Sequence, residues 1–96
     1  MKTNDNYAKP ILVILNVLAE MGVPCQLYPL WDGLQIRFPW GGGDIVCHGF
    51  SYGHDRGCVE SMGCPWDEDD VTCLTVEEAT IKVVDWYKTL VEKEGE

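Results

Sequence analysis

The sequence predicts an α+β fold, a two-layer sandwich of four antiparallel strands in two hairpins, with both helices covering one face of the sheet. Three observations predict it. Apolar residues follow the helical period over residues 11–21 and again over 75–91, and between them short runs alternate apolar and polar residues around glycine-containing turns. Hairpins with one apolar face need a cover, which two amphipathic helices can supply. With 96 residues, we expect one domain, 1–96.

The first helix is expected to begin at Asn6 or Lys9 and to end at Gly22. Pro10 would then fall in its first turn, where a missing backbone N–H is harmless. The apolar residues that recur at three- and four-residue intervals are Ile11, Leu15, Leu18 and Ala19 or Met21. They lie on one side of the helix, which we expect to be its packing face.

The first hairpin is expected around Trp31-Asp32-Gly33, because an Asp-Gly pair tolerates the positive φ angles of a tight turn. The residues expected to face inward are Val23, Cys25 and Leu27 before the turn and Leu34, Ile36 and Phe38 after it. Pro29 cannot donate a ladder hydrogen bond. The first strand is therefore expected to be short or to lie at an edge.

The second hairpin is expected to consist of a strand over residues 44–50 and another over 58–62. The glycines of residues 40–44 (WGGGD) do not form a phosphate-binding loop, because neither a Lys-Ser/Thr pair nor a helix follows them. Between the strands, Gly53 and Gly57 supply the positive φ that a turn needs. The residues between these glycines are expected at a solvated tip, and His48 at the surface or rim of the sheet.

A zinc site is the main alternative for this turn, and its ligands would be His54, Cys58, Cys64 and Cys47. The spacing of His54 and Cys58 suits zinc, but that of Cys58 and Cys64 is too wide, and strand alternation turns Cys47 inward. A catalytic cysteine would also need an oxyanion hole or a helix N-terminus, which the sequence does not place here. We therefore expect no metal, no cofactor and no enzymatic activity.

The last helix has a strong start signal, because Thr75 and Glu78 form a capping box. Its apolar residues form a wide stripe, which is expected to sit deep on the sheet. They are Ala79, Val83, Trp86 and Leu90, flanked by Thr80, Val84, Tyr87 and Val91.

The net charge of −9 is concentrated in the C-terminal third of the chain. Residues 1–59 hold five acidic and four basic side chains, whereas residues 60–96 hold eleven acids and three lysines. Such a field repels nucleic acid and anionic membranes and attracts a protein with a basic surface. No apolar run is long enough to span a membrane, and the first residues do not have the layout of a signal peptide. With five cysteines, an odd number, we expect a cytoplasmic protein without disulfides.

The candidate partner-binding residues combine acidic side chains with tryptophans that are hard to bury. Glu78, Asp85 and Glu92 recur at seven-residue intervals and so form a line on the outer side of the last helix, with Ile81 in the same polar face. The other candidates are Asp67, Glu68, Asp69 and Asp70 in the loop before the helix, together with Trp31, Trp40 and Trp66. Tryptophan beside charge is a common interface anchor.

The sequence therefore predicts a non-catalytic protein that binds a basic, nucleic-acid-handling protein through an anionic, tryptophan-bearing surface. In size and charge it resembles the small acidic inhibitors of phages and mobile elements, the anti-CRISPR proteins and the antirestriction DNA mimics. The alternatives are a zinc-stabilised domain and a housekeeping subunit or homodimer whose acidity serves solubility.

Overall fold

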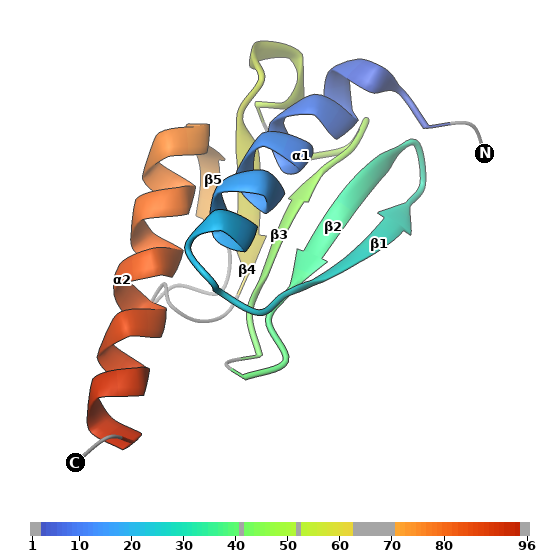
Figure 1. The fold of residues 1–96 in the computed structure, drawn as a ribbon. Coiled ribbons are helices and arrows are strands. Elements are labelled where there is room, and N and C mark those ends of the chain that lie inside the picture. The colour runs from blue at the N-terminus through green and yellow to red at the C-terminus, as the bar shows by residue number, and fades with distance from the viewer. Residues whose placement is uncertain (1–2, 41, 52, 63–70, 95–96) are drawn as a thin grey trace.

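The structure, a computed structural model, describes residues 3–40, 42–51, 53–62 and 71–94 (Figure 1). Its α+β class and its helix–strands–helix order are those predicted. The elements are α1 (Asp5–Glu20), β1 (Gln26–Leu30), β2 (Gly33–Arg37), β3 (Asp44–Cys47), the 3-10 helix η1 (His54–Arg56), β4 (Val59–Met62), β5 (Val71–Leu74) and α2 (Val76–Glu94). The strands are antiparallel and lie side by side in chain order.

The sheet has five strands instead of the predicted four, because residues 71–74 add β5 beside β4. Val59 lies opposite Leu74 and Ser61 opposite Val71, with a register irregularity between these pairs. β2 also pairs with β3, so the two predicted hairpins belong to one continuous sheet. The prediction missed β5 because the strand is short and follows a run of acids. Its pairing with β4 is not a local signal.

The two helices lie on one face of the sheet, as predicted (Figure 1). α1 crosses β2 and β3, whereas the main contacts of α2 are with α1. The inner stripe of α2 is buried at Ala79, Val83 and Val84 in the same core as the sheet residues, whereas its C-terminal turns extend past the rest of the molecule in Figure 1. The fully buried core residues include Ile11, Ile14, Leu18, Ile36, Phe38, Ile45, Val59 and Val83. Neither helix, within the described residues, combines the length and the apolar character that crossing a membrane requires.

α1 begins at Asp5, one residue before the earlier of the two predicted starts. The side chain of Asn4 caps the helix by accepting a hydrogen bond from the Asn6 backbone N–H at 2.9 Å. As a result Pro10 lies in the second turn of the helix instead of the first. Its side chain is buried.

β1 lies at an edge of the sheet, as Pro29 predicted. However, Leu27 is 40% exposed, although it lies opposite the fully buried Ile36. The inward orientation predicted for Leu27 gives no burial, because α1 covers β2 and β3 and leaves β1 uncovered.

β3 ends at Cys47, before the predicted end at Phe50, because the chain turns at His48. The Ser51 hydroxyl accepts a hydrogen bond from the His48 N–H at 3.0 Å and donates one to the His48 carbonyl at 2.9 Å. His48 is only 6% exposed, so its predicted place at the surface or rim is wrong. Farther along, Gly53 and Gly57 have φ angles of 83° and 71° on either side of η1, which confirms the turn predicted there.

Candidate binding surfaces

The predicted acidic line lies on the exposed side of α2. Glu78, Asp85 and Glu92 are all exposed, and Ile81 among them is 62% exposed. Glu78 also caps the helix: its Oε1 accepts the Thr75 N–H at 3.1 Å, and the Thr75 hydroxyl accepts the Glu78 N–H at 3.1 Å. Within the described residues, none of the three carboxylates forms an ion pair with lysine or arginine. Their charges are therefore available to a partner.

Three lysines on α2 reduce the charge of this surface. Lys82, Lys88 and Lys93 are exposed on the same helix as the acids. Lys82 and Asp85 line one shallow hollow of about 290 Å³, next to Trp86. The helix alone is therefore only weakly anionic. Most of the additional charge belongs to Asp67, Glu68, Asp69 and Asp70, which lie outside the described residues together with Trp66.

An apolar groove between α1 and α2 accounts for the exposed Ile81. This interhelical groove has a volume of about 290 Å³. The residues that line it are Val13 and Val17 of α1 and Val76, Glu77, Thr80 and Ile81 of α2. The sequence places Ile81 in a polar face but does not reveal the groove, because the groove depends on how the two helices pack. Val13, an apolar residue on the polar side of α1 that is exposed in the structure, is the feature of the sequence that could have indicated the groove.

The predicted tryptophans do not share one surface. Trp40 is half-buried: its indole N–H donates to the Pro24 carbonyl at 2.6 Å, and its ring lies 4.3 Å from that of Trp86. It therefore packs against the inner side of α2, away from the acidic line. Trp31 is 55% exposed at the β1–β2 turn, across the molecule from α2 (Figure 1).

The β1–β2 turn and the turn after β3 meet, and together they form a group that we call the aromatic corner, Trp31, Asp32 and Phe50. The Trp31 and Phe50 rings are nearly perpendicular, with centroids 5.6 Å apart. Asp32 Oδ1 accepts the Gly49 N–H at 2.8 Å, which joins the two turns. The positive φ of this hairpin turn falls on Trp31, at 53°, instead of on the Asp-Gly pair. Gly33 is needed for space, because a Cβ there would collide with the Cys47 carbonyl.

The predicted zinc ligands are not gathered into a metal site in the part of the chain that the structure describes. No group of three or more His, Cys, Asp or Glu side chains there could hold a metal ion, and Cys64 lies outside it. Cys47 is fully buried, and this burial raises the pKa of its thiol to about 11. The His54 ring packs edge-on against Tyr7, with centroids 5.0 Å apart, and Cys58 is half-buried.

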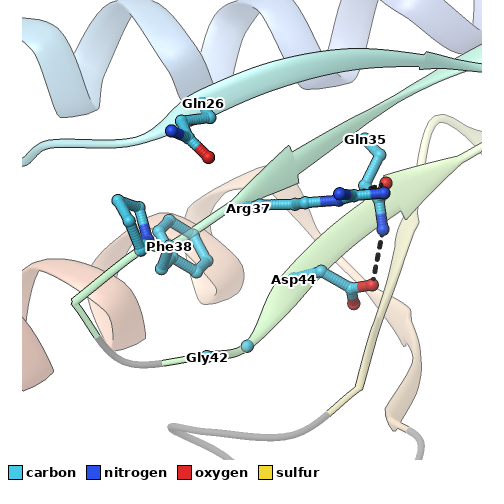
Figure 2. Close-up of a pocket in the computed structure, with 8 residues that line it drawn as sticks. Gln26, Gln35, Arg37, Phe38, Gly42 and Asp44 are labelled. Atoms are coloured by element: carbon cyan, nitrogen blue, oxygen red, sulfur yellow. Dashed lines mark hydrogen bonds between the residues drawn. The ribbon is translucent and has the colours of Figure 1, made fainter.

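The sheet face turned away from the helices has a polar hollow of about 380 Å³ beside the β2–β3 connection (Figure 2). Gln35 donates to Asp44 at 2.8 Å, and Arg37 donates to Gln35 at 2.9 Å. The Arg37 guanidinium also lies 4.2 Å from the centre of the Tyr28 ring, and Asp44 accepts the Met62 N–H at 3.1 Å. These polar groups bind one another across β1 to β4, so the network orders the open face of the sheet.

Comparisons with known proteins identify no relative of this chain. No protein-family model, curated protein or solved structure matches it.

Proposed function

We propose that this protein is a non-catalytic binding protein whose partner is a basic protein that handles nucleic acid. The contact surface is the outer side of α2 with the interhelical groove, and we expect the acidic residues 67–70 to contribute to it. The observation that carries the proposal is Ile81, which is 62% exposed within a line of exposed carboxylates. An apolar residue inside a charged rim is the usual arrangement of a protein–protein interface.

The acidic side chains determine which kind of partner this surface can bind. Carboxylates form charge-assisted hydrogen bonds with lysine and arginine, as phosphates do, so the surface can occupy a groove that otherwise holds nucleic acid. The charge of residues 60–96 also speeds the encounter with such a groove. An inhibitor of a restriction or CRISPR nuclease, acting in the cytoplasm, is the form of this function that best fits the chain's size and charge.

The interhelical groove adds affinity that does not depend on salt. The exposed Val13 and Ile81 leave space for one apolar side chain of the partner, with Glu77 at the rim. Burying such a side chain contributes roughly 1.5–3 kcal/mol. We therefore expect the partner to present an apolar side chain next to basic ones.

The test is inhibition of purified restriction endonucleases and RNA-guided nucleases, followed by binding measurements on the nuclease that is inhibited. The triple variant Glu78→Gln, Asp85→Asn, Glu92→Gln should bind about tenfold more weakly, which corresponds to about 1.4 kcal/mol. Ile81→Ser should weaken binding by a similar factor at both low and high salt.

The matched control removes three exposed acids elsewhere, with Asp5→Asn, Glu20→Gln and Asp55→Asn. It changes the net charge by the same amount and should bind nearly as wild type. Equal loss in both triple variants would show only a general charge effect. Absence of inhibition across the nucleases, or full binding by the α2 variant, would overturn the proposal.

A further inference from the structure

We propose that the aromatic corner is a binding site for a cationic side chain, an arginine, of a partner protein. It lies across the molecule from α2, and the proposal does not depend on the function proposed above. The ligand class follows from two exposed aromatic rings, one carboxylate and the way in which buried residues hold all three.

The rings provide the surface on which a cation binds. Trp31 is 55% exposed and Phe50 is 78% exposed, and their planes meet at 81°. A guanidinium or ammonium over an exposed aromatic face gains about 0.5–1 kcal/mol, and more when water is excluded. Within the described residues, no lysine or arginine of this chain is stacked on either ring. Both rings are thus open to a cation from outside.

The Asp32 carboxylate selects a positive charge. Its Oδ1 accepts the Gly49 N–H, and its Oδ2 has no hydrogen-bond partner among the described residues. A Cβ on Gly49 would lie 2.8 Å from Oδ2, so the carboxylate lies directly against this glycine, next to Phe50 in the chain. One acceptor oxygen therefore remains free between the two segments that carry the rings.

Buried residues hold the corner in a fixed arrangement. The Nδ1 atom of the buried His48 accepts the Phe50 N–H at 3.0 Å, and its ring contacts the Trp31 ring with centroids 4.7 Å apart. Ser51, only 1% exposed, fixes the His48 backbone through two hydrogen bonds. A positive φ at Trp31 is unfavourable for a bulky residue. Exposed side chains that are already ordered lose less entropy when they bind.

The charge distinguishes an arginine from other occupants. An apolar side chain covering the corner would remove water from the Asp32 carboxylate and would offer it no hydrogen-bond donor in return, which is unfavourable. A second copy of this chain carries a net charge of −9, so it is repelled. A planar guanidinium can stack on an aromatic ring and donate to Oδ2 at the same time, whereas an ammonium offers only a point charge.

The test is a titration of the ¹⁵N-labelled protein with three blocked tripeptides, Gly-Arg-Gly, Gly-Lys-Gly and Gly-Leu-Gly, followed by NMR. The arginine peptide should shift the Trp31 indole N–H and the Gly49 and Phe50 amides. The lysine peptide should bind several-fold more weakly, and the leucine peptide should cause no shift at these positions.

Three variants test whether the arginine peptide binds at the aromatic corner. Asp32→Asn keeps an oxygen to accept the Gly49 N–H and removes only the charge, so the fold should persist while affinity for the arginine peptide falls roughly threefold to fivefold. Phe50→Leu should weaken binding similarly. Glu20→Gln, an equal charge change at the exposed C-terminal end of α1, should leave it unchanged.

Equal binding of the leucine peptide, or no loss in Asp32→Asn, would overturn the proposal. Arginine-induced shifts confined to α2 would overturn it as well. Because these probes and variants do not involve Glu78, Ile81 or Glu92, failure here is distinguishable from failure of the proposed function.

Discussion

His48 is the residue whose burial the sequence did not reveal and whose titration the structure makes testable. Burial lowers the pKa of His48 below its ordinary value near 6.5, and His54 acts in the same direction, whereas the charge of Asp32 opposes them. The Nδ1 atom accepts the Phe50 N–H, which requires that this nitrogen carry no proton. The folded protein therefore favours the neutral imidazole.

This preference predicts a specific dependence of stability on pH. Above pH 6.5 the contribution of His48 is fully present, because the imidazole is neutral in both the folded and the unfolded chain. As pH falls below 6.5 the unfolded chain binds the proton first, so stability declines until the lowered folded pKa is reached and then levels off. In thermal denaturation at stepped pH, the wild type should lose more stability in this window than His48→Asn. Equal slopes for the two proteins would contradict the prediction.

At the scale of elements, features that depend on neighbouring residues could be predicted from the sequence, and features that depend on distant residues could not. The start of α2 was predictable, because Thr75 and Glu78 lie within one turn and interact with each other's backbone. β5 was not, because its only strong signal is its pairing with β4. The same distinction holds for the candidate site. Helical periodicity predicted the acidic line, but the aromatic corner requires two turns, 17 residues apart at Asp32 and Gly49, to meet.

The capping box also gives a prediction about α2. Thr75→Ala removes the acceptor for the Glu78 N–H and should lower the free energy of unfolding by about 1 kcal/mol. Thr75→Ser retains the hydroxyl, and serine caps a helix at least as well as threonine, so it should leave the free energy of unfolding nearly unchanged. Urea denaturation followed by circular dichroism measures both. A serine variant as unstable as the alanine variant would show that the hydrogen bond is not the source of the stability.

For the molecule as a whole, the uneven charge should oppose folding. Most of the net charge of −9 belongs to residues 60–96, and a large net charge destabilises a compact state through self-repulsion. α2 itself carries five acids and three lysines, so its lysines do not neutralise it. Salt screens repulsion between exposed charges over about 10 Å at 0.1 M. Sodium chloride should therefore stabilise the protein.

The expected effect is a rise in Tm by several degrees between low and moderate salt, since about 1 kcal/mol shifts the Tm of a domain of this size by roughly 4–8 °C. Replacing Asp67, Glu68, Asp69 and Asp70 by Asn and Gln should raise the Tm at low salt and reduce its further rise with salt, because the same repulsion has already been removed. A sucrose series serves as the control for effects that do not depend on charge. A Tm that stays constant or falls as salt increases would mean that nearby bases neutralise the acids, and the acidic surface could not then select a basic partner.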